Sequence, residues 1–381
     1  MHLTIDTRVL GYGGHSGVEE YAEHIIGGII ARAPHDRLTF FHNGVRIAKL
    51  PSAWTSNPNA SVTNWHIPNK LLDVSFGAFR FPRVTNTDVV FSPHFNIIET
   101  GISPHVITFH DLSFVHHPDF FPFRKRLWHS VQAPKTNAER AAHLIAVSEY
   151  TKYDLVTTWN IPKEKISVIY SGIDTQFRPI ATDDSLLREW KKQNNVAFPY
   201  LLYLGTLEPR KNITGAIRAF NILKASPQFR DLRLVLAGAP GWLYASIVRE
   251  AAHSPYRQHI IFWGPVKTEE RVLLYNGSEA FVYPSFFEGF GLPPLEAQAC
   301  GIPAVVADRT ALPEILGGGA LYVNPWRTGE LADALAEVIT NEGLRRTLRD
   351  KGLENAKRFS WERAADQTVT VLRNYADRTK I

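Results

Sequence analysis

The sequence predicts an α/β protein of two parallel-sheet domains, and three observations carry that prediction. The chain has 381 residues, whereas a single domain usually holds about 100–200. Short runs of β-forming residues alternate with helical patterns in both halves, and short connections join them. This alternation is typical of parallel sheets covered by helices on both faces. Hydrophobic residues make up 44% of the chain, so each half can bury a core.

In the first half, apolar and β-branched runs bounded by turn residues predict strands, and longer amphipathic stretches predict helices. We expect strands at 2–6, 38–42, 62–65, 89–92, 106–110, 144–147 and 166–170. We expect helices at 17–31, 69–79, 124–142 and 149–157.

The second half shows the same alternation more regularly. We expect strands at 200–204, 232–237, 260–263, 280–283, 304–307 and 321–323, with helices between them and at 329–340 and 344–358. A last helix, 361–377, begins after Ser360, which we interpret as its N-cap. The boundary falls in 171–199, where a proline and a short charged stretch interrupt the pattern. The predicted domains are therefore 1–175, joined by the C-terminal helix 361–381, and 176–360.

Composition excludes several classes of protein. The net charge is +5 and the basic residues form no run, so no nucleic-acid partner is expected. One cysteine, Cys300, allows no intramolecular disulfide. The first residues lack the pattern of a signal peptide, and no apolar stretch reaches about 18 residues. The histidines form no compact zinc-binding pattern, and we expect no metal site. We expect a cytoplasmic protein.

The segment 283–303 carries the richest pattern, because it follows a predicted strand and opens a helix. Gly289 and Gly291 allow a ligand to approach the backbone closely. Pro293 and Pro294 fit a first helical turn. Ligands of open α/β sheets bind at such strand ends, and a helix N-terminus favours an anion such as a diphosphate.

Two carboxylates, Glu288 and Glu296, flank this helix start. So close to an anion they would repel it unless they bound hydroxyl groups instead, as a sugar and a ribose would supply. The alternative is a solvent-facing loop glutamate followed by an ordinary glutamate of the first helical turns.

The segment 201–212 also runs from a strand through a tight turn into a helix, and the turn holds Arg210 and Lys211. Adjacent cations at a strand end suit a diphosphate leaving group, because arginine supplies a planar fork and lysine a point charge. The alternative is an exposed charged turn. No Asp-x-Asp motif occurs in the chain, so we expect these cations, and not a metal ion, to act on the diphosphate.

These segments resemble the retaining glycosyltransferases of family 4. The pair Glu288 and Glu296, separated by seven residues, is that family's signature. The stretches 207–212 (LEPRKN), 237–242 (AGAPGW) and 312–315 (LPEI) resemble its mannosyltransferase-like branch. The resemblance implies the GT-B fold, in which two Rossmann-like domains face each other across a cleft. It implies an N-terminal acceptor-binding domain, and a C-terminal domain that binds a nucleotide sugar.

The resemblance also implies roles for individual residues. Arg210 and Lys211 bind the diphosphate, Glu288 holds hydroxyl groups of the donor sugar, and Glu296 holds the ribose. The other implied donor contacts are Gly205 and Thr206 beside the phosphates, Val266 at the base, and the backbone N–H groups of Phe290, Gly291 and Leu292.

In the first half, a glycine loop at 11–17 follows the first strand. It resembles a dinucleotide fingerprint, but Ser16 replaces the third glycine and the expected acidic residue after the second strand is missing. An oxidoreductase is therefore disfavoured. The family resemblance implies that Gly13 and Gly14 face the diphosphate, whereas a plain tight turn is the alternative.

Three further residues of the first half are given roles by the resemblance or by local chemistry. His110 would lie beside the donor sugar and hydrogen-bond it, although a lone histidine is often structural. Asp111 is expected to orient its loop. Ser148 is expected to cap a helix.

The expected reaction is transfer of a hexose with retention of configuration and without a cofactor or metal. Mannose from GDP-mannose is the favoured donor, with UDP-glucose or UDP-N-acetylglucosamine as alternatives. The acceptor is a glycan or a lipid-linked oligosaccharide of polysaccharide biosynthesis. Rival hypotheses are a nucleotide-sugar epimerase of the same shape and a nucleotide-sugar-binding subunit without catalysis. The oligomeric state is left open.

The stretches 70–83 and 120–128 mix aromatic with basic residues. Such stretches can rest on the anionic inner face of a membrane, which would make the protein peripheral there. The alternative is a pair of ordinary half-buried helices.

Overall fold

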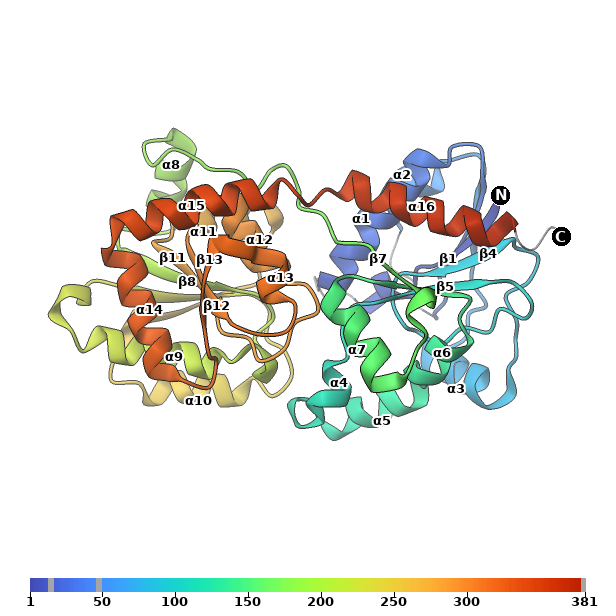
Figure 1. Cartoon of the computed structure of the whole chain (residues 1–381), viewed down its shortest axis with the longest axis horizontal. Coiled ribbons are helices and arrows are strands. Elements are labelled where there is room, and N and C mark those ends of the chain that lie inside the picture. The colour runs from blue at the N-terminus through green and yellow to red at the C-terminus, as the bar shows by residue number, and fades with distance from the viewer. Residues whose placement is uncertain (13–16, 46–49, 378–381) are drawn as a thin grey trace. The chain divides into compact units, whose positions relative to one another are not determined.

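The computed structural model describes residues 1–12, 17–45 and 50–377. The chain divides into two compact units (Figure 1). The first unit holds Met1–His116, Phe123–Gly172 and the segment from Ser360 onward, and the second holds His117–Pro122 and Ile173–Phe359. The chain thus changes unit at Gly172, close to the boundary expected at 175. The short segment His117–Pro122 belongs to the second unit, although it comes from the first half of the sequence.

The first unit is built on a seven-stranded parallel sheet in the order β3-β2-β1-β4-β5-β6-β7. Its strands are β1 (His2–Asp6), β2 (Arg37–Phe41), β3 (Ala60–Thr63), β4 (Val89–Ser92), β5 (His105–Phe109), β6 (His143–Ala146) and β7 (Ile166–Val168). Its helices before the crossover are α1 (Gly17–Arg32), α2 (Ser52–Thr55), α3 (Asn69–Phe79), α4 (Ser113–His116), α5 (Phe123–Gln132), α6 (Pro134–Arg140) and α7 (Glu149–Trp159). Every strand was predicted within two residues of its observed bounds.

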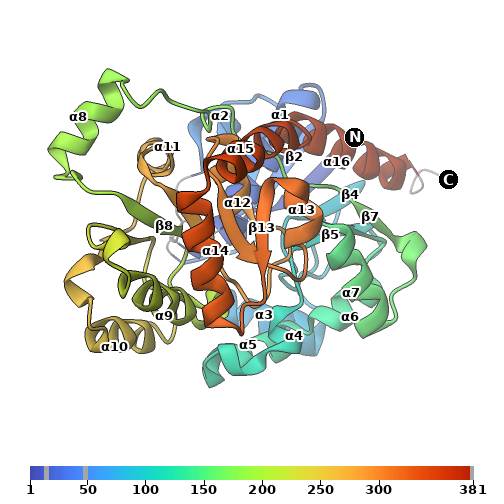
Figure 2. The ribbon, with the colours of Figure 1, turned by 60° about the vertical axis from the view of Figure 1, so that its left-hand side comes forward.

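The last helix, α16 (Trp361–Asp377), belongs to the first unit and lies along α1 in both views (Figure 1, Figure 2). A methyl group at Gly28 would stand 2.5 Å from the Cβ of Ala365, so the glycine allows the two helices to approach. His24 stacks on Trp361 with ring centroids 4.5 Å apart. Ser360 accepts a hydrogen bond from the backbone N–H of Arg363 and caps α16 as expected.

The second unit is built on a six-stranded parallel sheet in the order β10-β9-β8-β11-β12-β13. Its strands are β8 (Tyr200–Leu204), β9 (Arg233–Ala237), β10 (Ile260–Gly264), β11 (Ala280–Tyr283), β12 (Ala304–Ala307) and β13 (Ala320–Val323). Its helices are α8 (Ser185–Gln193), α9 (Ile213–Lys224), α10 (Ala245–His253), α11 (Thr268–Gly277), α12 (Leu292–Ala299), α13 (Leu312–Leu316), α14 (Thr328–Thr340) and α15 (Glu342–Ala356).

The order of this second sheet matters for function. Successive strands run outward from β8 through β9 to β10, and the chain then returns to place β11 on the other side of β8. The strand order therefore reverses between β8 and β11. In open α/β sheets, ligands bind outside the carboxyl ends of the strands at such a reversal. The strand order therefore predicts a ligand site at the segments that follow β8 and β11.

One expected helix was wrong. The stretch 124–142 is not one helix but two, α5 and α6, which are separated at Ala133. Ala133 has a φ of 44° and Pro134 begins the second helix. Proline has no N–H and disfavours helical geometry in the residue before it, so the first helix ends there. The sequence pattern gave the correct periodicity but not this break.

Candidate functional site

Glycines end the three strands on one side of the second sheet. Gly205, Gly238 and Gly264 follow or close β8, β9 and β10, and all three have positive φ. A Cβ atom at Gly238 would lie 2.0 Å from the carbonyl oxygen of Gly205, so no other residue fits without moving the backbone. The carboxyl ends of β8, β9 and β10 therefore present backbone without side chains at these three positions, next to the strand reversal.

A short 3-10 helix, Pro209–Lys211, follows β8 and holds the two predicted cations. Asn212 then adopts a left-handed conformation with a φ of 53°, and its side chain accepts a hydrogen bond from the N–H of Gly215 to cap α9. Its amide also donates to the carbonyl oxygen of Pro325 at 2.8 Å. The C-terminal end of the turn is thus fixed directly after the two cations.

Lys211 and Glu288 form a buried ion pair. The lysine Nζ lies 2.6 Å from Oε1 of Glu288, and the two side chains are 10% and 7% exposed. Nζ also donates to the hydroxyl of Tyr283, the last residue of β11, at 2.7 Å. Residues that lie 77 positions apart in the chain thus meet at the strand reversal.

Arg210 joins the same cluster from the other side. Its Nη1 donates to the carbonyl oxygen of Phe287 at 2.7 Å and lies 3.4 Å from Oε2 of Glu288. Its Nε donates to Oε1 of Glu208 at 3.0 Å. Two cations and two carboxylates therefore alternate in one network, and each of these side chains is at most 14% exposed.

Burial and charge act in opposite directions on this cluster. Burial alone raises the pKa of Glu288, but Lys211 and Arg210 outweigh it and hold that pKa below its ordinary value. Burial, followed by the nearby Arg210, lowers the pKa of Lys211. Burial and then Glu288 raise the pKa of Tyr283, so its phenol stays protonated. Glu288 is therefore a carboxylate at neutral pH, surrounded by donors.

The loop that carries Glu288 is held along its length. The backbone N–H of Glu288 donates to the hydroxyl of Thr310 at 3.1 Å. The N–H of Phe286 donates to the carbonyl oxygen of Arg210 at 2.9 Å. The loop after β11 is thus bonded directly to the turn after β8, which fixes the acidic and basic residues relative to each other.

The segment His117–Pro122 packs against this loop within the second unit. The rings of Phe120 and Phe286 stack with centroids 5.5 Å apart, and those of His117 and Phe287 lie 5.8 Å apart. The indole N–H of Trp242 donates to the carbonyl oxygen of Phe120 at 2.6 Å. The sequence prediction gave this segment no such position.

The predicted glycine at the start of α12 is required. Gly291 precedes Leu292, the first residue of the helix, with a φ of 101°. A Cβ there would be strained and would stand 2.7 Å from a methyl group of Leu312. Phe290 is buried and meets Phe359 edge-on at 5.7 Å, so its contribution to a ligand would come from the backbone. Pro293 and Pro294 lack N–H groups, which leaves the preceding residues as donors.

Glu296 is also buried, one turn further along α12. Arg271 of α11 forms an ion pair with its Oε1, and the hydroxyl of Tyr275 donates to its Oε2 at 2.7 Å. Burial and then Glu296 raise the pKa of Tyr275, which keeps that donor protonated. Both carboxylate oxygens therefore have a partner from α11, and a ribose would have to use their remaining lone pairs.

The other predicted donor contacts lie along the same carboxyl edge. Thr206 follows Gly205, and its carbonyl oxygen accepts from the hydroxyl of Tyr203 at 3.1 Å. Val266 lies half-buried in the connection between β10 and α11. Thr206, Val266, Lys211 and Glu288 thus all lie after the carboxyl ends of strands in the second sheet. A cavity of about 760 Å³ in this unit lies instead near Pro303 and Glu279, at the amino ends of β12 and β11.

His110 follows β5 in the first unit. Its Nε2 lies 2.8 Å from the carbonyl oxygen of Pro93, which can only accept, so Nε2 carries the hydrogen and Nδ1 has a lone pair. Burial lowers the pKa of His110, and the bond to Pro93 and the charge of Asp111 only partly oppose this. The ring is therefore a neutral hydrogen-bond acceptor. Asp111 accepts from the N–H and hydroxyl of Ser113, as an orienting residue would.

Ser148 caps α7 by accepting from the N–H of Thr151 at 3.0 Å, as predicted. Gly13 and Gly14 lie outside the described residues. Within the described ranges, no group of three or more histidine, cysteine or acidic side chains is arranged to hold a metal ion.

Sequence reasoning missed the partners that orient the predicted residues. Glu208 and Tyr283 lie within the recognised segments 201–212 and 283–303 but were given no role, although their position at strand ends could have indicated one. Arg271, Tyr275 and Thr310 come from other elements, and no local pattern marks them. Only the packing of α11 on α12, and of the loop before α13 on the Glu288 loop, brings them in.

Two family models match this chain. Residues 187–355 match the model described as glycosyl transferases group 1, and residues 62–177 match glycosyltransferase family 4. Together they fall on both halves of the sequence.

Named relatives agree with these matches. O-antigen chain mannosyltransferase B of Escherichia coli is 31% identical over 265 residues, which cover 69% of this chain and 68% of the relative. The serotype-specific mannosyltransferase WbdA of Escherichia coli is 30% identical over 61% of this chain, but the match spans only 28% of WbdA.

Solved structures share the architecture. Sucrose-phosphate synthase from Thermosynechococcus elongatus aligns with a TM-score of 0.73 and 19% identity over 98% of each chain. HepE of Anabaena, solved with UDP and glucose, aligns with a TM-score of 0.73 and 17% identity over 98% of this chain and 99% of HepE. At these identities the likeness shows the fold, which is GT-B. From the sequence matches and this fold, the chain belongs to glycosyltransferase family 4 and is a glycosyltransferase.

Proposed function

We propose that the enzyme transfers mannose from GDP-mannose to a glycan or lipid-linked oligosaccharide, with retention of configuration and without a metal ion or cofactor. Support for mannose comes from relatives: besides the two above, the relatives include the O-antigen chain mannosyltransferase RfbU of Salmonella typhimurium, 31% identical over 58% of this chain and 56% of RfbU. O-antigen is a polysaccharide, which favours a glycan acceptor.

The observation that carries the proposal is the meeting of Arg210, Lys211 and Glu288 at the strand reversal of the second unit. A diphosphate leaving group gains negative charge as the sugar departs. Fixed cations near that charge lower the barrier, and such electrostatic stabilisation is often the largest catalytic contribution. The N-terminus of α12, next to Gly291, adds partial positive charge to the same edge.

Glu288 has a second use in this proposal. Its carboxylate orients Lys211 and Arg210 in the unliganded protein, and it keeps lone pairs for hydroxyl groups of the donor sugar. Glu296 would hold the ribose hydroxyls in the same manner, with Arg271 and Tyr275 fixing its orientation. Within the described residues, no carboxylate is recognised that would attack the anomeric carbon. Retention of configuration therefore favours attack by the acceptor hydroxyl on the same face of the sugar from which the phosphate departs. The departing phosphate then accepts the proton of the acceptor hydroxyl.

The first unit would bind the acceptor, and His110 would accept a hydrogen bond from a sugar hydroxyl through Nδ1. The neutral state of the ring fits this role, because a charged imidazolium has no acceptor nitrogen. Gly13 and Gly14 would approach the diphosphate.

A donor screen tests the proposal. Thermal shift with GDP-mannose, UDP-glucose and UDP-N-acetylglucosamine should show selective stabilisation by the guanosine donor, and product analysis should show mannose joined through the retained anomer. Chelation with EDTA should leave turnover unchanged, because protein cations act on the diphosphate. Selective binding and use of a UDP-sugar would overturn the GDP-mannose assignment, and strict metal dependence would overturn the mechanism.

Two other functions remain to be separated by one assay. An epimerase would release an altered sugar or nucleotide without acceptor, whereas a binding subunit would release neither with acceptor present. A transferase consumes donor only slowly until the acceptor is added. Acceptor-dependent release of GDP therefore discriminates all three.

We also propose that the surface of α3 and α5 rests on an anionic membrane. The structure's described helices include none long and apolar enough to cross a membrane. The two helices pack side by side (Figure 1, Figure 2). They and the adjoining residues expose large apolar side chains: Leu71, Val74, Phe79, Phe81, Phe123 and Leu127 are 45–76% exposed.

The exposed charges of this surface have one sign. Lys70, Arg80, Arg124, Lys125 and Arg126 are exposed, whereas Asp73, the acidic residue of α3, is buried and paired with Arg8 at 2.9 Å. Apolar side chains among cations fit a headgroup layer that contains anionic lipid.

Vesicle sedimentation tests this surface. The protein should sediment with phosphatidylglycerol vesicles and not with phosphatidylcholine vesicles, and replacing Phe79 and Phe123 by serine should abolish sedimentation. Leu186, 60% exposed on α8, supplies a matched control as Leu186→Ser. Equal loss in the control, or unchanged sedimentation of the double variant, would contradict the assignment.

A further inference from the structure

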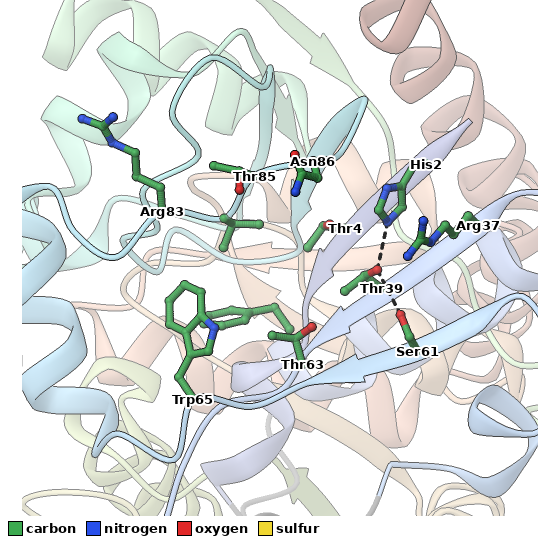
Figure 3. Close-up of a pocket in the computed structure, with 12 residues that line it drawn as sticks. His2, Thr4, Arg37, Thr39, Ser61, Thr63, Trp65, Arg83, Thr85 and Asn86 are labelled. Atoms are coloured by element: carbon green, nitrogen blue, oxygen red, sulfur yellow. Dashed lines mark hydrogen bonds between the residues drawn. The ribbon is translucent and has the colours of Figure 1, made fainter.

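The first unit contains a cavity of about 420 Å³ over one face of β1, β2 and β3 (Figure 3). The strands supply its floor, and the segment Arg83–Asn86 stands over it. All of its lining residues belong to the first unit, whereas Lys211 and Glu288 belong to the second. The cavity is therefore not part of the cluster that would handle the donor.

The face beneath this cavity has an unusual composition for a parallel sheet. Parallel strands are normally covered on both faces and carry apolar residues throughout. One face here follows that rule, since Leu3, Ile5, Leu38 and Phe40 are fully buried. The alternate residues, which line the cavity, are mostly polar: His2, Thr4, Arg37, Thr39, Ser61 and Thr63. This face is built as a polar surface and not as core.

An aromatic wall closes one end of the polar face. Trp65 is half-buried and packs against Phe41 with ring centroids 4.8 Å apart. Phe41 in turn belongs to a hydrophobic cluster with Leu72 and Phe76 of α3. Figure 3 shows the indole of Trp65 on the same side of the cavity as Arg83, with Arg37 at the far side. The core thus ends at an indole ring that borders the cavity.

Hydrogen-bonding groups continue from this wall across the strands. The Nε2 of His2 lies 2.9 Å from the hydroxyl oxygen of Thr39, which lies 3.1 Å from that of Ser61 (Figure 3). Within the described part of the chain, the guanidinium groups of Arg37 and Arg83 and the hydroxyl of Thr63 make no hydrogen bond. The cavity therefore offers unused donors, together with hydroxyl groups that can both donate and accept.

This combination selects among classes of ligand. A phosphate would need cations or backbone N–H groups that converge on one point, whereas the two arginines lie on different sides of the cavity. A sugar ring presents C–H groups on its faces, which pack on an aromatic ring, and hydroxyl groups around its edge. Ligand pockets also combine one apolar surface with a few placed polar groups in a volume of roughly 300–1,000 Å³.

We propose that this cavity is a saccharide-binding site that holds one or two hexose units of a glycan chain, with a sugar face on Trp65 and hydroxyl groups on Thr63, Ser61 and the two arginines. That the sugars are mannose units rests on the proposed function; that the site binds a saccharide does not. Such a site would hold a glycan acceptor through residues other than those of the donor cluster, and would favour long acceptors over short ones.

Fluorine NMR of the full chain tests the site without any donor. The chain has nine tryptophans, so uniform 5-fluorotryptophan labelling gives a resonance for Trp65 that the Trp65→Phe variant identifies. Titration with α-mannobiose should shift that resonance selectively. Inorganic phosphate serves as the second probe.

Two substitutions on the same strand supply the comparison. Ser61→Trp fills the cavity from β3 and should weaken mannobiose binding by about tenfold or more, as expected when two or so hydrogen bonds are lost. Val62→Trp places the same ring on the opposite face of β3, where Val62 is 48% exposed, and should leave binding unchanged. The Lys211→Met variant should also bind normally.

The outcomes separate this proposal from the proposed function. Loss of binding in Ser61→Trp alone supports the site, even if no mannosyl transfer is found. No response to α-mannobiose would overturn the mannose units. No response to either α-mannobiose or the glucose disaccharide maltose, a response to phosphate only, or equal binding by Ser61→Trp and wild type would overturn the saccharide site.

Discussion

Replacement of Lys211 by methionine gives the sharpest test of the candidate site, because it removes one charge and keeps the length of the side chain. The change leaves the Glu288 carboxylate, 7% exposed, without the cation at 2.6 Å. Loss of one partner of a buried pair costs about 3–5 kcal/mol. Arg210 remains 3.4 Å from the other carboxylate oxygen, so we expect a value at the lower end, about 3 kcal/mol.

The effect on catalysis has a separate size. If Lys211 stabilises the departing diphosphate, its loss should reduce kcat by about 10²–10³-fold, as removal of a single preorganised donor does elsewhere. A destabilisation of 3 kcal/mol should lower Tm by roughly 6–12 °C for a unit of this size. Acceptor-dependent release of GDP, measured well below the lowered Tm, keeps the two effects apart.

A second substitution separates stability from catalysis. In Lys211→Met/Glu288→Gln, no uncompensated carboxylate remains, so part of the lost Tm should return while transfer stays defective. Lys192→Met, on the exposed surface of α8, is the matched control for loss of a lysine. Turnover by Lys211→Met within about fivefold of wild type, against the 10²–10³-fold loss expected for such a donor, would refute the phosphate role. Equal Tm values for the single and double variants would refute the account of the pair.

Three further changes test neighbouring parts of the structure. Burial raises the pKa of Glu288, but Lys211 and Arg210 outweigh burial and hold that pKa below 4.5. The stability advantage of wild type over Glu288→Gln should therefore be complete above pH 4.5 and disappear as the pH falls through the lowered pKa. Urea unfolding across pH 3–7 measures this advantage, and an advantage that grows on acidification would contradict the prediction. Tyr275→Phe removes the 2.7 Å hydrogen bond to Glu296. Calorimetry should show GDP binding weakened about fivefold, as expected for the loss of one hydrogen bond. Unchanged binding would argue that Glu296 does not hold the ribose. His110→Phe removes Nδ1 but keeps a ring against Tyr21, whose ring centroid lies 4.8 Å from that of His110. This variant should lower kcat about tenfold and leave the affinity for GDP unchanged. A normal kcat would show that His110 has a structural role only.

Much of the fold was predictable because its strands have strong local signals. The runs at 200–204, 280–283 and 304–307 are apolar, short and bounded by turn residues, and their predicted bounds match β8, β11 and β12. Ser148 and Ser360 marked helix starts for a chemical reason that needs no tertiary context. The break at Ala133 was missed because the helical periodicity continues across it, and only the proline that follows signals the end of a helix.

The site was predictable to a different extent. Arg210, Lys211 and Glu288 were found because each lies beside a strand end or a glycine turn. Their distances were not predictable, since 77 residues separate Lys211 from Glu288. The sequence suggested that Glu288 binds hydroxyl groups of the donor sugar, and the unliganded structure adds its pairing with both cations, which sequence reasoning did not predict. Its charge is better explained as part of a neutralised cluster that a ligand would have to enter.

The two sheets share one topological feature, which links these observations. The second sheet reverses its strand order between β8 and β11, and the loops after those strands carry Lys211 and Glu288. The first sheet reverses between β1 and β4. The residues after β4 are Pro93, which fixes His110, and His94, whose buried Nδ1 has no hydrogen-bond partner among the described residues.

Burial of an unpartnered polar atom is unfavourable, so a hydrogen-bond partner at Nδ1 of His94 would stabilise this part of the first unit. Burial lowers the pKa of His94 well below its ordinary value, and His110 and His129 lower it further. Its ring is therefore neutral, and one of its nitrogens carries no hydrogen. Ligands of an open α/β sheet bind at the strand reversal, and His94 and His110 follow β4 and β5, the two strands on one side of the reversal in the first sheet. The topology of the first unit thus supports the proposal that this unit binds the acceptor substrate, and this support does not depend on the family resemblance.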